Sequence, residues 1–389
     1  MKRVCFFAVL ILILLLCSCS ALRDAWQPTS FFRSDTPPAE QVLVSPVILL
    51  QQAAINDRGS VPVPPSDLPP EQPKQPQVQA KPKPQEKHIR DTIVMNFIGD
   101  VMLAAENGDD GFWSFNLFAY DTPKDYYFKK MLPLFSADDW TVANCENVFT
   151  DRENPTPTEK QGEYTYWYYS GTENAQIFSA GSIELVSLAN NHALDYGYEG
   201  RDDTAKALTA AGCTPIPEQR SVILEKSGVK VGLFCVSMYS EYYLTPILEW
   251  LEENRDTCDF RIVYYHGGTE RVHEPNAWRI RASRAMIDAG ADLVLGNHPH
   301  VLQPIEHYNG KTIVYSLGNF LFGGSHTCEN RTMVYTLTLK ITDRKLTGTE
   351  EKITPCYCYG ELWQPTPIEK EEDKSRVLAF LRGEREKPY

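Results

Sequence analysis

The sequence lacks the features by which several classes of protein are recognised. No Cys-x-x-Cys pair occurs among its ten cysteines, which argues against a zinc knuckle or a thioredoxin-type redox motif. No basic stripe occurs either, because 38 Lys and Arg residues stand against 51 Asp and Glu residues, for a formal net charge of −13. A nucleic-acid-binding domain carries a clustered positive surface. We therefore expect no nucleic-acid partner.

The chain also lacks an apolar run of the length that a membrane-spanning helix needs, about 20 residues. Its apolar run at residues 4–16 is shorter and follows a basic start, a pattern typical of a secretory signal. Leu16-Cys-Ser-Cys19 resembles a bacterial lipobox. We expect residues 1–19 to be a signal peptide with lipid attachment at Cys19, and an uncleaved signal anchor or simple secretion are the alternatives. All three place the remainder at the extracytoplasmic face of the cell membrane or beyond it.

A proline-rich stretch follows, and we assign residues 20–90 to a disordered linker. Twelve of the 27 prolines lie between Pro37 and Pro84, among many Gln, Lys and Glu residues. A segment of this composition cannot bury enough apolar surface to offset the entropy lost on ordering. Proline-rich linkers are extended and semi-rigid. We expect the linker to hold the next domain away from the membrane.

The remainder is long enough for one sizeable hydrophobic core, which we place at residues 91–359, followed by a charged C-terminal tail, 360–389, with a short helix. Strands are expected at 91–100, 141–146, 183–192, 229–236, 260–266, 292–295, 312–319 and 333–341. The strand at 229–236 is expected to pair with 221–224 as a hairpin. Helices ended by a glycine are expected from Asp203 and from Ala277. The alternation of strands and helices predicts an α/β sandwich.

Side chains that can bind a metal ion or move a proton follow five of these strands. They are Asp100, Asn144 with Glu146, Asn191 with His192, His266, and the pair His298 and His300. In open α/β sheets, ligands bind at the carboxyl ends of the strands. Imidazoles and carboxylates are both ligands of divalent metals. Each strand end alone is ordinary, but five in one domain predict a metal site or a site derived from one.

The domain contains seven cysteines, an odd number that leaves at least one free thiol. Cys235 lies in an apolar run, which favours a place in the core. Cys356 and Cys358 are too close in sequence to bridge comfortably with each other, although either could pair elsewhere.

With these motifs in place, the chain resembles the CapA family of bacterial capsule (poly-γ-glutamate) synthesis proteins, a branch of the calcineurin-like metallophosphoesterases. The matching segments follow the family's order: Gly99-Asp-Val-Met-Leu103, Asn144-Cys-Glu146, Ser187-Leu-Ala-Asn-Asn-His-Ala-Leu-Asp-Tyr-Gly197, His266-Gly-Gly-Thr-Glu270, Gly290-Ala-Asp-Leu-Val-Leu-Gly-Asn-His-Pro-His-Val301 and Tyr315-Ser-Leu-Gly-Asn-Phe320. The resemblance implies a four-layer metallophosphoesterase-like sandwich, with two central mixed β-sheets flanked by helices.

The resemblance also implies roles for individual residues. The implied ligands of one or two divalent ions, Mn²⁺ or similar, are Asp100, Glu146, Asn191, His266, His298 and His300. His192 is implied to contact a transferring phosphoryl group, with Asp195 as its catalytic partner. Glu270 is implied to orient a ligating imidazole, as Asp195 orients His192. Met102 departs from the pattern, because metallophosphoesterases usually have a histidine there, and this leaves the number of ions open.

These implications lead to a main hypothesis and two alternatives. The main hypothesis is a cell-surface protein of capsule or poly-γ-glutamate synthesis with a metal-dependent, phosphoesterase-like hydrolase site. The alternatives are a non-catalytic, membrane-tethered export component that binds polymer in a degenerate metal cleft, and an enzyme that cleaves or transfers amide bonds. The expected partners are an anionic cell-surface polymer or its precursor and membrane-embedded capsule synthesis or export proteins. In so acidic a chain, cations such as Arg201, Arg279 and Lys311 would have to attract that polymer.

Overall fold

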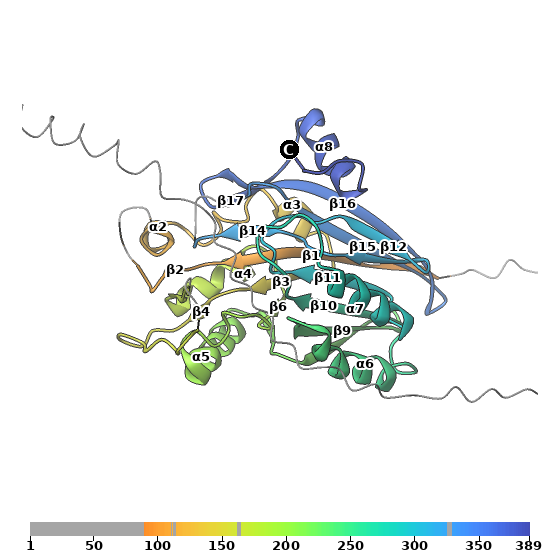
Figure 1. Ribbon diagram of the computed structural model, residues 1–389, viewed down its shortest axis with the longest axis horizontal. Helices are drawn as coiled ribbons and strands as arrows, with labels where there is room; N and C mark the ends of the chain where they lie inside the picture. The colour runs from red at the N-terminus through yellow and green to blue at the C-terminus, as the bar shows by residue number, and fades with distance from the viewer. Residues whose placement is uncertain (1–88, 110, 112–113, 162–164, 325–328) are drawn as a thin grey trace, which may run out of the picture. The chain divides into compact units, whose positions relative to one another are not determined.

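Two β-sheets organise the part of the chain that the computed structural model describes, residues 89–324 and 329–389 without 110, 112–113 and 162–164 (Figure 1). The expected signal peptide, the lipidation site Cys19 and nearly all of the expected linker lie outside the described residues. Among the described residues, no helix has the length and apolar character to cross a membrane.

The first sheet has eight strands and is mixed, with the order β17-β16-β15-β1-β3-β6-β7 and β14 also paired to β1. Its strands are β1 (Arg90–Met102), β3 (Trp140–Cys145), β6 (Leu185–Ser187), β7 (Thr214–Ile216), β14 (Asn319–Phe322), β15 (Thr332–Thr342), β16 (Lys345–Glu361) and β17 (Gln364–Pro367). Strands β3 and β14 run parallel to β1, whereas β15, which includes the strand expected at 333–341, runs antiparallel to it.

The second sheet has six strands in the order β12-β13-β11-β10-β9-β8. Its strands are β8 (Arg220–Lys226), β9 (Val229–Ser237), β10 (Phe260–His266), β11 (Leu293–Asn297), β12 (Ile305–Tyr308) and β13 (Lys311–Val314). The four central strands are parallel, and the predicted hairpin is confirmed as β8 and β9. A small third sheet joins β2 (Ala105–Glu106), β4 (Val148–Phe149) and β5 (Tyr168–Ser170).

The two large sheets share one apolar core. Side chains of β1 such as Phe97 are fully buried in the same cluster as Leu233 of β9 and Ile262 of β10. Burial of this kind stabilises a fold by about 1.5–3 kcal/mol per large apolar side chain. The α/β prediction is confirmed by this arrangement of sheets and helices.

Helices cover the outer faces of both sheets. On the first sheet they are α2 (Phe115–Asp121), α3 (Leu132–Phe135), α4 (Gln176–Ala180) and α5 (Gly197–Ala210), beside a 3-10 turn at Thr172–Ala175. On the second sheet they are α6 (Leu244–Glu253) and α7 (Ala277–Asp288), after a 3-10 turn at Glu241–Tyr243. Figure 1 shows α6 and α7 beside β9, β10 and β11, and α5 beside β4. The order of layers is therefore helices, sheet, sheet, helices.

The chain crosses from one sheet to the other between β13 and β14. The single strand predicted at 312–319 is instead two strands, because the backbone turns at Gly318 with a φ of +74°. A glycine favours such a turn since it has no Cβ to clash. The crossing places Asn319 beside Asp100, whose N–H donates to the Gly318 carbonyl at 3.0 Å.

The residues that follow Tyr359 contribute to the fold. Strand β17 pairs with β16, and α8 (Glu371–Leu381) is the short helix predicted in the tail 360–389. Val377, Phe380 and Leu381 are buried in the core between the sheets.

The cysteines that the structure describes are buried and form no disulfides with one another. They are Cys145, Cys213, Cys235, Cys258, Cys356 and Cys358. The prediction that Cys235 belongs to the core is confirmed, because it is fully buried between the sheets.

Candidate metal centre

Parallel strands of both sheets end at one place, and their terminal side chains meet there. Asp100 lies near the end of β1, and Glu146 directly follows β3, its parallel neighbour. His266 is the last residue of β10, and the turn after β11 carries His298 and His300. Within each sheet, parallel neighbours present their carboxyl ends on the same side, and the packing of the two sheets on one core brings the two sets of ends together.

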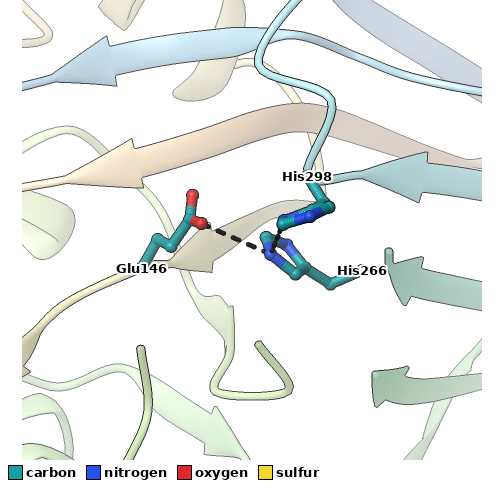
Figure 2. A group of neighbouring side chains, drawn as sticks. All are labelled: Glu146, His266 and His298. Carbon is teal, nitrogen blue, oxygen red and sulfur yellow. Dashed lines mark hydrogen bonds and ion pairs between the residues drawn. The ribbon is translucent and has the colours of Figure 1, made fainter. Parts of the chain in front are cut away.

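Two histidines bridge two buried carboxylates. The Nδ1 atom of His266 lies 3.4 Å from Asp100 Oδ1, and its Nε2 atom lies 3.3 Å from Glu146 Oε1. His300 spans the same pair, at 3.3 Å from Asp100 Oδ2 and 3.8 Å from Glu146 Oε1. Asp100, Glu146 and His266 are almost completely buried. Figure 2 shows Glu146 and His266 facing each other with His298 beside them.

His298 is held against this group by its backbone and its ring. Its N–H donates to Asp100 Oδ2 at 3.1 Å, and its Nδ1 atom lies 3.0 Å from His266 Nε2. Both His298 and His300 have positive φ values, 92° and 58°. Such values are uncommon for residues other than glycine and are costly unless the surroundings impose them. The strain at this turn therefore marks the place where two side chains are turned toward the carboxylates.

The buried carboxylates favour positive charge on two of the three imidazoles, those of His266 and His300. Burial opposes a charged His266, but Glu146 and Asp100 outweigh it and raise the pKa of His266 to about 9. The same contest raises the pKa of His300 to about 10. Burial also opposes ionisation of Asp100, yet these two histidines hold the pKa of its carboxyl well below the usual range. Burial, followed by repulsion from His266 and His300, lowers the pKa of His298 to about 2.

Glu146 shows that the residues present fit a divalent ion. Both of its carboxylate oxygens are buried and accept no hydrogen bond, which is costly for an ionised group. Three sets of side chains place possible ligand atoms within 4.8 Å of one another: Glu146, His266 and His298; Asp100, Glu146 and His300; and Glu270, His298 and His300. Imidazole nitrogens with carboxylate oxygens are a donor set that suits Mn²⁺, Zn²⁺ or Fe²⁺.

Amide side chains surround the cluster. Asn191, a predicted ligand, places its Oδ1 atom 2.8 Å from His266 Nε2. Asn144 donates to Asp100 Oδ1 at 2.9 Å, and Asn190 donates in turn to Asn144 Oδ1 at 3.0 Å. Asn319 places its Oδ1 atom 2.9 Å from His300 Nδ1. Sequence reasoning passed over Asn190 and Asn319, although each lies within a segment that carries the family resemblance.

Glu270 makes no hydrogen bond to an imidazole among the described residues. Its side chain is exposed, and it is near enough to His298 and His300 to be a possible third ligand and to help raise the pKa of His300. The Nδ1 atom of His300, which an orienting carboxylate would bind, instead lies 2.9 Å from Asn319 Oδ1 and 3.3 Å from Asp100 Oδ2.

His192 and Asp195 form a pair next to the cluster, as the resemblance implied. The Nδ1 atom of His192 lies 2.8 Å from Asp195 Oδ2 in a buried contact. Asp195 also accepts from the Tyr168 N–H at 2.8 Å and forms an ion pair with Lys160 at 2.5 Å. Lys160 was not predicted, because it stands 32 positions before His192 in a stretch with no regular motif. Asp195 is therefore fixed from three sides and fixes the imidazole in turn.

Met102 lies in apolar surroundings. It is fully buried with Ala104, Tyr168, Phe322 and Cys358. The ring of Phe322 lies 5.1 Å from that of His300. A thioether is a poor ligand for a hard divalent ion, so this side of the cluster offers packing rather than a ligand.

A cavity of about 700 Å³ opens beside the cluster. His192 and His300 line it together with Tyr168, Arg271 and Lys387. It has room for a drug-sized molecule or a short polymer segment.

The cations that were expected to attract a polymer lie elsewhere. Arg279 is completely buried, Arg201 pairs with Asp202, and Lys311 pairs with Asp292 at the start of β11. That expectation was wrong because sequence does not show that Arg279 is buried or that Lys311 stands at the strand end opposite the cluster. The basic residues of the cavity are Arg271 and Lys387.

Residues 94–324 match the family model described as bacterial capsule synthesis protein PGA_cap. The chain belongs to this family. The match covers all of the residues of the cluster, from Asp100 to His300, so the predicted family resemblance is confirmed on the part of the chain that holds the site.

Named relatives agree with the family. The chain is similar to the PGA biosynthesis protein CapA of Bacillus subtilis, with 29% identity over 74% of this chain and 77% of the relative. It is also similar to the capsule biosynthesis protein CapA of Bacillus anthracis, with 26% identity over 63% of this chain and 64% of the relative. Among solved structures, a hypothetical protein from Thermus thermophilus aligns with a TM-score of 0.41 and 15% identity over 68% of this chain and 99% of that one. A likeness of that size supports no conclusion about this chain.

Proposed function

We propose that this chain acts in the synthesis of a capsule-type anionic polymer, as the names of its relatives suggest, through a divalent metal site at the strand ends. The observation that carries the proposal is the environment of the Glu146 carboxylate. Its two oxygens are buried without a hydrogen bond, and Oε1 lies 3.3 Å from His266 Nε2 at the end of β10 and 3.8 Å from His300 Nε2 in the turn after β11. A bound cation satisfies such a carboxylate at the least structural cost.

The residues that would hold the ion are Asp100, Glu146, His266, His298 and His300, with Asn191 at the exposed side. When bound, the ion would polarise an oxyanion of the substrate and supply a nucleophilic water near neutral pH. The fold implied by the resemblance, a metallophosphoesterase-like sandwich, uses such a site for hydrolysis of phosphoryl bonds. We therefore favour hydrolysis or transfer at a phosphoryl or related bond.

His192 would serve the reacting group directly. Asp195 binds the Nδ1 side of its ring, so Nε2 is the nitrogen left for the substrate. His192 lines the cavity, where it can donate a proton or a hydrogen bond to an oxygen that gains charge. Lys160 neutralises Asp195 from the opposite side and keeps this arrangement in one geometry.

The cavity offers two cations to an anionic group of the substrate, although Glu106, Glu270 and Glu329 also line it. Arg271 and Lys387 lie on its wall, and neither forms an ion pair with a described residue. In a chain of net charge −13, free cations in a cavity attract anions locally despite the repulsion of the whole molecule. A carboxylate or phosphate of the polymer or its precursor would fit this side.

The second candidate is a non-catalytic, membrane-tethered component of polymer export. Met102 favours it, because an apolar side chain stands where a ligand of a second ion is expected. In either case we place the domain outside the cytoplasm, tethered by the lipidated Cys19 or an uncleaved signal anchor. Membrane-embedded synthesis or export proteins would then be its partners.

The deciding experiment combines metal binding with turnover. The full-length chain is assayed with Mn²⁺ for binding and for hydrolysis of phosphomonoesters and phosphodiesters, beside His300→Ala and the control His307→Ala on β12. We expect His300→Ala alone to lose both properties. If it changes neither, the enzymatic proposal is wrong. If the wild type binds Mn²⁺ and poly-γ-glutamate but hydrolyses nothing, the export function replaces it.

A further inference from the structure

Arg279 is a buried cation without an anionic partner. Its side chain is completely inaccessible to solvent, yet no carboxylate of the described residues pairs with it. It also stands in the first turn of α7, where the helix dipole disfavours positive charge. Burial of an unpaired charge costs stability. Arg279 therefore lowers stability at this position, and the packing of apolar side chains does not explain why an arginine is present.

The guanidinium is instead bound by neutral groups that lead to the metal-site loops. It donates to Gln303 Oε1 at 2.6 Å, to the Tyr265 hydroxyl at 3.1 Å and to the carbonyl of Tyr315. Tyr265 immediately precedes His266, and Gln303 closes the turn that carries His298 and His300. The Arg279 side chain thus contacts residues close in sequence to the candidate ligands His266, His298 and His300.

Two glycines make room for this contact. A Cβ at Gly268 would meet Arg279 Nη1 at 2.8 Å, and a Cβ at Gly296 would meet Nη2 at 2.7 Å. Gly268 lies two residues after His266, and Gly296 lies two residues before His298. The loop after β10 and the end of β11 therefore both approach the guanidinium closely with their backbones.

Gln303 extends the connection from one loop to the other. Its Nε2 atom donates to the Val272 carbonyl at 2.7 Å and to the Glu274 carbonyl at 3.1 Å, while its Oε1 atom accepts from Arg279. Residues 267–276, which follow His266, are thereby joined to residues 297–303. Three other contacts also join these segments: the Gly267 N–H donates to the Asn297 carbonyl at 3.1 Å, the Arg271 N–H donates to the Pro299 carbonyl at 2.8 Å, and His273 Nδ1 lies 2.9 Å from the Leu302 carbonyl. The Arg279–Gln303 pair adds a link made by side chains and is the one that also reaches Tyr265, next to His266.

We propose that Arg279 is a positioning residue that sets the distance between His266 and the pair His298 and His300, and so sets the affinity of the cluster for a divalent ion. Groups that orient metal ligands typically change metal affinity by about 10–100-fold when removed. The affinity part rests on the proposed metal site, whereas the positioning part concerns the loops alone. The two parts are therefore tested separately.

The test compares Arg279→Met with Arg261→Met in the full-length chain. Arg261 is a matched control, because it is a partly buried arginine at the start of β10 that bonds Leu251 and Asp292 far from the cluster. We expect Arg279→Met to weaken Mn²⁺ binding, measured by calorimetry, by about tenfold or more. Arg261→Met is expected to lower thermal stability without changing the affinity.

Hydrogen exchange supplies a readout that needs no metal. We expect Arg279→Met to accelerate amide exchange selectively in residues 267–276 and 297–303, and Arg261→Met to leave these segments protected. Arg279→Lys retains the charge but cannot bridge the same acceptors, so it serves if the methionine variant does not fold, with the same pattern expected. Two results overturn the positioning role. One is an acceleration of exchange that is equal across the whole domain, and the other is an exchange rate in both segments that equals that of the wild type. If the wild type binds no Mn²⁺ but the exchange pattern holds, only the proposed metal function fails.

Discussion

Glu146 is the residue on which the metal proposal depends most. A carboxylate with two buried oxygens and no hydrogen bond is destabilising by several kcal/mol unless a cation accompanies it. In the protein alone, the protonated rings of His266 and His300 partly meet this need, as their raised pKa values show. A divalent ion would meet it more fully.

Replacement of this carboxylate should therefore remove metal binding without unfolding the protein. We expect Glu146→Gln to weaken Mn²⁺ binding by about 100-fold, because a charged ligand shared by two of the three candidate ligand sets is lost. Calorimetric titration of the full-length chain measures this. Glu184→Gln, a half-buried carboxylate that accepts from the Thr141 N–H, is the control and should bind as the wild type does. Equal affinities of Glu146→Gln and the control would contradict the proposed site.

Met102 tests how many ions the cluster can hold. It packs with Phe322, which in turn contacts His300, so an imidazole here would lie near the cluster. We expect Met102→His to raise the number of Mn²⁺ ions bound per chain, since it restores the ligand type that metallophosphoesterases usually have. Met102→Leu is the control and should leave the stoichiometry unchanged. An identical stoichiometry in both variants would show that Met102 does not limit the site.

At the scale of elements, the strand ends were predictable and their connections were not. The residues of the cluster meet because each follows an apolar run that forms a parallel strand, and this pattern is visible in the sequence. They are Asp100, Glu146, His266, His298 and His300. The crossing at Gly318 was missed, since one apolar run supplies strands to both sheets. Lys160 and Arg279 were missed or misjudged because their partners lie far away in sequence.

The charged composition of helix α8 suggested a tail outside the folded domain, but the helix packs on the core. The segment is rich in charge, but its buried side chains Val377, Phe380 and Leu381 belong to the main core. We expect Phe380→Ala to lower the free energy of unfolding by about 3 kcal/mol, because it leaves a cavity in that core. Ser375→Ala on the same helix should change it by less than about 0.5 kcal/mol. Urea denaturation measures both, and a loss under about 1 kcal/mol for Phe380→Ala would mean that α8 is not docked as described.

Asp138, just before β3, makes stability depend on pH. Burial raises its pKa to about 6, although hydrogen bonds from Thr141 and Asn96 act in the opposite direction. A carboxyl with a raised pKa in the folded state contributes stability below its unfolded pKa, and that contribution is lost as pH rises through about 6. Asp138→Asn removes this loss of stability, because an amide does not ionise.

We therefore expect Asp138→Asn to gain about 1 kcal/mol over the wild type between pH 4 and pH 7, a value reduced from the full pKa shift because solvent reaches this half-buried group. Urea denaturation at several pH values measures the difference. Asp121→Asn, an exposed carboxylate on α2, is the control and should show no such trend. A difference for Asp138→Asn that does not change with pH would contradict the assignment.

At the scale of the whole molecule, the family and the α/β class followed from the sequence because its motifs are local and ordered. The cavity could not be predicted, since Lys387 and Arg271 join His192 and His300 only after the chain has folded. The acidic net charge gave no hint of these cations. The cavity beside the candidate site thus brings these two cations together with the carboxylates Glu106, Glu270 and Glu329.

A crystal structure of the full-length chain grown with Mn²⁺ tests the central claim most directly, through the anomalous scattering of the ion. We expect an anomalous peak within bonding distance of Glu146 and at least two of His266, His298 and His300. A structure with well-ordered strand ends and no peak at this cluster, or with the ion bound elsewhere, would contradict the account.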